Sequence, residues 1–210
     1  MKKPLIILTG PTAVGKTKLS ISLAKAVNGA IISADSMQVY RHMDIGSAKI
    51  RPEEMRGVPH YLIDVLDPSE EFHVVKFVEL AHEAMEKIYA AGQIPIVTGG
   101  TGFYIQALLK EVDFTESHGE LPIRKELEEK AATVYGAAEL YQKLSEVDPA
   151  SAETIHPNNV KRVIRALEYY YETGQKISEH NEEQKQKESP YCSAYFVLND
   201  ERSILYDRID

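Results

Sequence analysis

The eight residues Gly10-Pro-Thr-Ala-Val-Gly-Lys-Thr17 constrain this chain more than any other feature of its sequence. They satisfy the pattern G-x-x-x-x-G-K-[ST], follow the apolar run Leu5–Leu8 and precede a helical pattern. In this setting the glycines let backbone N–H groups turn toward an anion, and the positive end of the helix dipole points to the same place. Lys16 adds a positive charge, and the Thr17 hydroxyl is a ligand for Mg²⁺. The pattern predicts that a diphosphate or triphosphate is bound by Gly10, Pro11, Thr12, Ala13, Val14, Gly15, Lys16 and Thr17.

The composition indicates a globular intracellular protein. The chain has 210 residues, enough for one domain and a sizeable insertion, and a chain of this size folds without disulfides. The single Cys192 cannot form an internal bridge, and no cysteine–histidine spacing matches a zinc site. The apolar run before the loop is too short for a signal peptide or a membrane span. We therefore expect a cytoplasmic protein with no membrane partner.

The net charge of −8 does not exclude a nucleic-acid partner, because the charge is unevenly distributed. Residues 1–110 carry 12 basic and 11 acidic side chains, whereas residues 111–190 carry 10 and 17. Exposed charges more than about 8 Å apart are largely screened at physiological salt. A distant acidic surface therefore leaves a local basic site intact.

Apolar runs alternate with helical patterns over residues 1–110. We predict buried strands at Leu5–Leu8, Ala30–Ala34, Tyr61–Leu66 and Ile94–Val97. Helices are predicted from Lys18 to Asn28, from a start between Ser69 and His73 to Gly92, and from Phe103 to Leu109. The inward-facing residues are predicted to be Leu19, Leu23, Ala26 and Val27 in the first helix and Val74, Phe77, Ala81, Met85 and Ile88 in the second. This alternation is typical of an α/β domain with a parallel sheet flanked by helices.

The pattern changes near residue 111. Residues 111–121 are polar and acidic, which predicts a linker, and Pro122 stands at a favourable first position of a helix. Residues 122–174 are predicted to be consecutive helices, with turns near Gly136, Asp148-Pro149 and His156-Pro157. Residues 178–190 have almost no apolar side chains, which predicts a mobile segment. Ala194–Leu198 is predicted to be a strand that returns to the sheet, followed by a helix. We therefore predict a core formed by residues 1–110 and 191–210 and a helical insertion formed by residues 111–190.

Two polar residues, Asp35 and Thr101, directly follow predicted strands. Ligands of parallel sheets bind beyond the carboxyl ends of the strands, so both residues should share a rim with the phosphate loop. Asp35 can hold Mg²⁺ through water or accept a proton, and its alternative role is that of a turn residue or helix cap. Thr101 lies in Thr98-Gly-Gly-Thr-Gly102, which is either a second backbone cradle or a tight turn that needs its glycines.

A basic stripe is predicted on the helix at residues 158–173. Val160, Val163, Ile164 and Leu167 share one face of this helix, and Lys161, Arg162 and Arg165 lie on the other. Such a stripe either follows a sugar-phosphate backbone or is simply a solvated face. The seven histidines show no spacing typical of metal ligands, and for His60 we favour a structural role.

Four stretches together resemble the signature sequences of the tRNA dimethylallyltransferases, also called tRNA isopentenyltransferases. They are Asp35–Lys49, Gly57–Asp64, Gly99–Tyr104 and the tract from Ile155 through Arg162 and Arg165–Glu168. The resemblance covers most of the chain, and the stretches occur in the order of the family. It implies a P-loop NTPase-like α/β fold with an all-helical insertion. Family members usually continue well past residue 210, which implies further core structure, further RNA contacts and a phosphate-binding arginine beyond this chain.

The resemblance implies transfer of a dimethylallyl group from dimethylallyl diphosphate to N6 of the adenosine on the 3′ side of the tRNA anticodon, position 37 of tRNA. The phosphate loop would hold the diphosphate of the donor, with Mg²⁺ bound at Thr17. Asp35 would take the proton from the adenine amine, and Thr101 would help to position the reactants. The tRNA contacts implied by the resemblance are Asp35, Ser36, Met37, Gln38, Thr101, Arg124, Arg162 and Arg165. We expect the enzyme to be a monomer.

Three other functions remain compatible with the residues. A small-molecule P-loop kinase would share the fold, the metal and an acceptor-binding Asp35. An RNA-binding protein switched by a nucleoside triphosphate would use the same loop without covalent chemistry. An enzyme that prenylates free adenine nucleotides is the third alternative, and the helical insertion with Arg162 and Arg165 argues against it.

Overall fold

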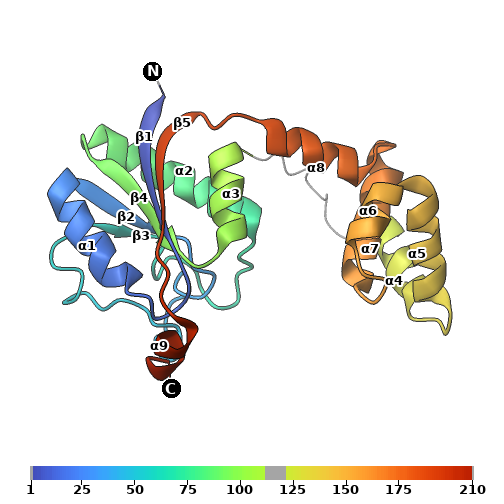
Figure 1. The fold of residues 1–210 in the computed structure, drawn as a ribbon, viewed down its shortest axis with the longest axis horizontal. Helices are drawn as coiled ribbons and strands as arrows, with labels where there is room; N and C mark the ends of the chain where they lie inside the picture. The colour runs from blue at the N-terminus through green and yellow to red at the C-terminus, as the bar shows by residue number, and fades with distance from the viewer. Residues whose placement is uncertain (1, 112–121, 210) are drawn as a thin grey trace. The chain divides into compact units, whose positions relative to one another are not determined.

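The computed structural model describes residues 2–111 and 122–209, which form two compact units (Figure 1). One unit combines Met1–Val112 with Ser189–Asp210, and the other is Asp113–Glu188. These bounds lie within two residues of the core and insertion predicted from the sequence. The predicted linker at residues 111–121 lies outside the described residues, except for Glu111.

A five-stranded parallel sheet forms the centre of the first unit. Its strands follow the order β3-β2-β4-β1-β5, and every pair of neighbours is parallel. The strands are β1 (Lys3–Thr9), β2 (Gly29–Ser33), β3 (His60–Tyr61), β4 (Ile94–Gly99) and β5 (Tyr191–Val197). This arrangement confirms the α/β fold class, and it brings the ends of β1, β2 and β4 together at one edge.

Helices cover both faces of this sheet (Figure 1). They are α1 (Lys16–Val27) on one face and α2 (Val74–Ala90) and α3 (Gly102–Lys110) on the other, and the short α9 (Arg202–Asp207) follows β5 beyond the end of the sheet. Successive residues of a strand point to opposite faces, so Ile31 packs with the α1 residues Ile21 and Ala24, whereas Ile32 packs with Phe77 of α2. The inward-facing residues predicted for α2 are confirmed, with Val74 only partly buried.

The inner face of α1 differs from the predicted one. The buried residues are Ser20, Ile21 and Ala24, whereas Leu19 is 44% exposed and Ala26 is also exposed. Leu23 and Val27 pack at the margin of the same core. The small side chains at positions 20 and 24 let the helix axis approach the sheet, and Leu19 then lies outside the buried arc. A face chosen by apolar residues alone cannot include a buried serine.

The predicted strand Tyr61–Leu66 ends after Tyr61. Leu62 and Asp64 have φ angles of 62° and 54°, in the left-handed region, which an extended strand excludes. The bend presents the Asp64 carboxylate to Lys49, whose Nζ lies 2.6 Å from Asp64 Oδ1 and 2.7 Å from Asp44 Oδ1. The Lys49 side chain is only 4% exposed. The bend after Tyr61 thus serves the ion pairs of the buried Lys49. A pattern of apolar residues contains no information about such an ion pair.

The second unit is a bundle of short helices. They are α4 (Pro122–Ala131), α5 (Gly136–Val147), α6 (Pro149–Thr154), α7 (Val160–Thr173) and α8 (Ile177–Gln186). Their core contains Leu127, Leu140, Leu144, Ala152, Val163, Ile164, Ala166 and Leu167. The first helical position of Pro122 and the three turns are confirmed.

The segment predicted to be mobile is instead largely the helix α8. Its second residue, Ser178, donates from Oγ to Asp148 Oδ1 at 2.6 Å and from its backbone nitrogen to Oδ2 at 3.0 Å. Asp148 is buried and also accepts two hydrogen bonds from Ser151. Burial alone would raise the pKa of Asp148, but these hydrogen bonds outweigh it and lower the pKa. Polar contacts therefore hold this helix, which explains why its sparse apolar pattern was misleading.

Replacing Gly99 with alanine is expected to lower the free energy of unfolding by about 1–3 kcal/mol. A Cβ at Gly99 would overlap the carbonyl oxygen of Ala34, which is backbone and cannot rotate away. Gly102→Ala is the control, because a Cβ there meets no atom within 4 Å. Urea denaturation of the two variants measures the difference. Equal stability of the two variants would contradict the close approach of β4 to residue 34.

Candidate functional site

The loop that is predicted to bind phosphate connects β1 to α1, as the sequence predicts. Ala13 and Gly15 have φ angles of 64° and 94°, which turn the loop backbone in the left-handed region. The Lys16 side chain folds across the loop, and its Nζ donates to the Gly10 carbonyl at 2.8 Å and the Pro11 carbonyl at 2.7 Å. The loop thus already encloses a positive charge at the place where an anion would bind.

Lys16 interacts electrostatically with Asp35. Burial lowers the pKa of Lys16 below its ordinary value, and the negative charge of Asp35 counteracts part of that shift. The same carboxylate also acts on Tyr104. Burial raises the pKa of Tyr104, and the neighbouring Tyr40 and Asp35 raise it further. Asp35 thus faces both the loop and the first turns of α3.

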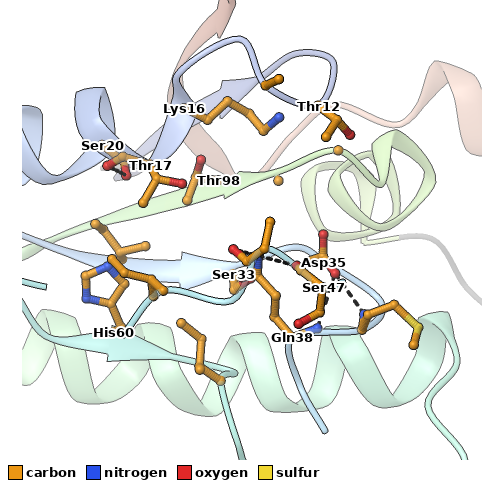
Figure 2. A pocket seen from close by; sticks show the side chains of 18 of the residues that line it. Thr12, Lys16, Thr17, Ser20, Ser33, Asp35, Gln38, Ser47, His60 and Thr98 are labelled. Atoms are coloured by element: carbon orange, nitrogen blue, oxygen red, sulfur yellow. Dashed lines mark hydrogen bonds between the residues drawn. The ribbon is translucent and has the colours of Figure 1, made fainter. Parts of the chain in front are cut away.

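A cavity of about 470 Å³ lies between the loop and the segment after β2 (Figure 2). Figure 2 shows Asp35 across this cavity from Lys16 and Thr12. The lining combines loop residues, polar strand ends and an apolar part. Its residues are Thr12, Ala13, Gly15, Lys16, Thr17, Ser20, Ile31, Ser33, Asp35, Met37, Gln38, Gly46, Ser47, Ala48, Ile50, His60, Ile63, Thr98, Gly99 and Gly100.

Of the two roles that the sequence leaves open for Asp35, the structure shows that of a turn residue. Its Oδ1 accepts from the backbone nitrogens of Met37 at 2.8 Å and Gln38 at 3.2 Å, so it caps the turn after β2. Within residues 2–111 and 122–209, no ion pair involves this carboxylate. One oxygen is therefore fixed by the backbone while the carboxylate remains available to a molecule in the cavity.

The neighbours of Asp35 differ in their surroundings. Gln38 is held on both sides, because its Oε1 accepts from Ser33 Oγ at 3.0 Å and its Nε2 donates to the Ala48 carbonyl at 3.2 Å. Met37 lines the cavity and is 42% exposed. Ser36 is exposed and is not part of the lining. The predicted RNA contacts of these residues stay predictions.

Thr98 is a polar lining residue that the sequence argument missed. Its Oγ1 is buried without a hydrogen-bond partner in the described part of the chain. In the sheet Thr98 pairs with Leu8 and Ser33, the penultimate residue of β1 and the last of β2. The register of the sheet could have indicated Thr98, because its partner Leu8 on β1 lies just before the loop that begins at Gly10. Thr101, which the sequence favoured, directly precedes α3 and does not line the cavity.

The oxygen atoms that line the cavity beside the loop suit a magnesium ion that is bound mainly by phosphate groups of the substrate. Among the described residues no group of three or more histidines, cysteines or carboxylates could hold a metal. Mg²⁺ usually keeps several waters and takes few protein oxygens together with substrate phosphates. Thr17 and the unpaired Thr98 hydroxyl both line the cavity beside the loop, so the residues fit such an ion.

Part of the cavity lining is apolar. Ile31, Ile50 and Ile63 line it together with His60. The Nδ1 atom of His60 lies 2.8 Å from the Val58 carbonyl oxygen, and burial lowers the pKa of the imidazole. The predicted structural role of His60 is compatible with this contact, and its ring is a neutral part of the wall at neutral pH.

An arginine from the end of the described chain reaches the phosphate loop. Arg208, just after α9, donates from Nη1 to the Ala13 carbonyl at 3.3 Å and pairs with Asp200 at 3.1 Å. The resemblance places a phosphate-binding arginine beyond residue 210, whereas an arginine within the chain already contacts the loop. Its 195-residue separation from Ala13 explains why local sequence patterns could not place it there.

The three predicted RNA-binding arginines lie in the helical unit. Arg124 of α4 pairs with Glu128 at 3.1 Å and with Glu168 at 3.3 Å, and Arg165 of α7 lies 3.6 Å from Glu168. Arg162 is exposed and forms no ion pair with a described residue. The basic stripe of α7 is thus partly neutralised by a buried glutamate.

No helix in the described residues is long and apolar enough to span a membrane.

Sequence comparisons identify relatives over the whole chain. A sequence model described as IPP transferase matches residues 38–210. A protein of Lachnoclostridium phytofermentans named tRNA dimethylallyltransferase is 65% identical over 208 residues, which are 99% of this chain and 66% of that protein. One of the same name from Bacillus licheniformis is 51% identical over 209 residues, again 66% of that protein. The chain therefore spans slightly less than two thirds of the length of these curated relatives.

Solved structures agree with the fold. A eukaryotic dimethylallyltransferase described as acting on tRNA matches 99% of this chain and 51% of its own, with a TM-score of 0.86 and 36% identity. The tRNA isopentenylpyrophosphate transferase of Bacillus halodurans matches 100% of this chain and 64% of its own, with a TM-score of 0.65 and 47% identity. The P-loop NTPase-like fold predicted from the sequence is thereby confirmed.

Proposed function

Because the chain belongs to the IPP transferase family, we propose that it transfers a dimethylallyl group from dimethylallyl diphosphate to N6 of the adenosine next to the tRNA anticodon, releasing diphosphate. The names of the relatives support the reaction. The observation that carries the proposal is the cavity of about 470 Å³ with Lys16 on one side and Asp35 on the other. The proposed enzyme is a cytoplasmic monomer.

The loop side of the cavity receives the diphosphate of the donor. In the proposal, Lys16 exchanges the Gly10 and Pro11 carbonyls for phosphate oxygens. Loop N–H groups and the start of α1 stabilise the same negative charge. Thr17, with the Thr98 hydroxyl also in the lining, would hold a Mg²⁺ ion, whose charge would help to neutralise the departing diphosphate. These groups act where charge develops as the carbon–oxygen bond breaks.

The apolar wall suits the five-carbon chain of the donor. Ile31, Ile50 and Ile63 offer hydrocarbon surface and no competing nucleophile. Ligand pockets commonly combine such a wall with a few polar groups that fix orientation. The wall therefore supports a donor that carries an apolar group on its diphosphate.

Asp35 is proposed as the base that takes the amine proton. The adenine nitrogen forms a bond to the first carbon of the dimethylallyl group, the carbon–oxygen bond breaks, and diphosphate leaves with its electron pair. The proton released from nitrogen passes to the Asp35 carboxylate, whose Oδ1 is held by Met37 and Gln38. Thr101, next to the cavity wall, is proposed to help position the reactants.

The proposed acceptor is a base in a single-stranded loop of tRNA. Extruding such a base costs a few kcal/mol, less than from a duplex. Ser36, Met37 and Gln38 are proposed to contact the RNA next to Asp35. Arg124, Arg162 and Arg165 are proposed to contact its phosphates, because phosphate contacts orient a nucleic acid on a protein.

Incubation with labelled dimethylallyl diphosphate, Mg²⁺ and an unmodified tRNA transcript tests the reaction directly. Digestion of the tRNA is expected to yield prenylated adenosine, and omission of Mg²⁺ should lower the yield. An arm with adenosine monophosphate in place of tRNA tests the nucleotide-prenylating alternative. Consumption of ATP with a phosphorylated product would favour the kinase, and nucleotide-dependent RNA binding without a modified base would favour the switch.

Replacing Thr98 with valine is expected to weaken the binding of Mg²⁺ and diphosphate by about 2–10-fold, the worth of one hydrogen bond. The same change should slightly stabilise the free protein, because it removes a buried hydroxyl that has no partner. Calorimetric titration with pyrophosphate and Mg²⁺ measures the first effect, and urea denaturation the second. Thr154→Val, in the helical unit, is the control. Unchanged pyrophosphate affinity would remove Thr98 from the site.

A further inference from the structure

Glu168 of α7 is a buried carboxylate within the helical unit. Its side chain is 1% exposed, next to the core residues Ile164 and Leu167. Its Oε2 accepts from Arg124 Nη1 at 3.3 Å, and Arg165 Nη1 lies 3.6 Å away. Its Oε1 is buried and has no hydrogen-bond partner among the residues that the structure describes. A buried charge is costly unless it is fully paired, so this arrangement needs a reason.

The two arginines approach the same carboxylate from different helices. Arg124 belongs to α4 and Arg165 to α7, and each side chain is 41% exposed. Each guanidinium has five N–H donors, and Glu168 engages few of them. Glu128 pairs with Arg124 from the exposed side, where ion pairs are weak. Each arginine therefore keeps N–H donors that Glu168 does not engage on a side chain that is partly exposed, and Glu168 reduces the repulsion between the two positive charges.

Glu168, Arg124 and Arg165 do not satisfy all of their hydrogen-bonding groups among themselves. The contact with Arg165 is longer than a hydrogen bond, and Glu168 Oε1 is unpaired. A purely structural buried pair gains its stability from complete hydrogen bonding, which is missing here. The two guanidinium groups are neighbours because both lie beside the same Glu168 oxygen, and guanidinium groups bind phosphate through paired N–H groups.

We propose that Glu168 is a positioning residue that holds Arg124 and Arg165 side by side, so that both grip one phosphate of the RNA backbone. The inference rests on the proposed function, because the RNA is taken to be the tRNA substrate. Glu168 itself does not touch RNA. A negative charge beside an RNA-binding site repels the RNA. In this proposal that cost is outweighed, because the two arginines bind a phosphate better when Glu168 orients them than when they are free.

The test uses the sign of the effect on tRNA affinity. Glu168→Gln removes a negative charge with almost no change of shape. If the arginines acted as independent charges, the added net positive charge would strengthen tRNA binding. The proposal expects the opposite, a loss of affinity of about 3–10-fold, by analogy with one or two lost hydrogen bonds. Fluorescence anisotropy with the whole protein and a labelled tRNA transcript measures the dissociation constant.

Glu172→Gln is the matched control, because it makes the same charge change one turn further along α7 at an exposed residue. Its tRNA affinity should stay equal or rise. A second control places Glu168→Gln in the double variant Arg124→Ala and Arg165→Ala. There the proposal expects no further loss, because the residues through which Glu168 acts are absent. A continued loss in that background would show a general structural effect and overturn the proposal.

The outcomes separate this inference from the proposed function. If the unmodified protein binds tRNA and Glu168→Gln binds equally well or better, only the inference fails. If the unmodified protein does not bind tRNA, the proposed function fails and the inference with it. Should Glu168→Gln not fold, as judged by circular dichroism, the pair Arg124→Lys and Arg165→Lys replaces it. These keep the charge but lose the planar forks, so the proposal expects a similar loss, and unchanged affinity overturns it.

Discussion

Replacing Asp35 with asparagine is expected to lower the turnover number for prenyl transfer by about 10²–10⁴-fold, the usual contribution of a general base. An amide cannot take the proton from the adenine amine. It still offers an oxygen to the backbone nitrogens of Met37 and Gln38, so the turn after β2 is kept. Single-turnover measurements at saturating donor and tRNA report the chemical step directly.

Asp35→Ala separates the two roles of this residue. The alanine variant loses both the base and the cap, so it should match the asparagine variant in turnover and also lose stability, by about 1 kcal/mol for a lost turn contact. Donor affinity of both variants should not fall, because each substitution removes a negative charge that faces Lys16 and the anionic donor. Near-normal turnover in Asp35→Asn would remove Asp35 from the role of base.

Replacing Lys16 with alanine is expected to weaken pyrophosphate binding by about 10–100-fold. A charge-assisted hydrogen bond contributes about 1.5–3 kcal/mol, and about 1.4 kcal/mol corresponds to a factor of ten. The loss should shrink at high salt, because part of it is screened. Titration calorimetry with pyrophosphate and Mg²⁺ measures the affinity without depending on turnover.

Lys18→Ala is the control for Lys16. Lys18 is exposed on the same helix and carries the same charge, but it does not line the cavity. Its removal should change pyrophosphate affinity less than about twofold, as expected for a screened surface charge. If both variants lost the same affinity, the effect would be one of overall charge, and the assignment of the loop to the diphosphate would be wrong.

Local patterns predicted the parts of the fold that depend on neighbours in sequence. The loop at residues 10–17, the strand Ile94–Val97 and the helix ended by Gly92 each carry their own signals. Gly92, for example, has a φ of 68°, which favours glycine at a helix end. The position of Asp35 beside the loop followed from its place directly after a predicted strand, since the strands of a parallel sheet end at a common edge.

Parts of the fold that depend on distant polar contacts were not predicted. Lys49 bends the segment after Tyr61 through a carboxylate 15 residues away, and Asp148 holds α8 from 30 residues away. Arg208 reaches the loop from the other end of the chain. Apolar periodicity reports which face of an element is buried, but it contains no information about which charged side chains meet across the fold.

The folded-back Lys16 has a consequence for ligand choice. Its ammonium group already has two acceptors in the loop, so an incoming anion must compete with the carbonyls of Gly10 and Pro11. A singly charged or poorly oriented anion gains little from that exchange. A ligand with two linked phosphoryl groups would replace both acceptors at once, so we expect the resting loop to favour a diphosphate over weakly bound anions.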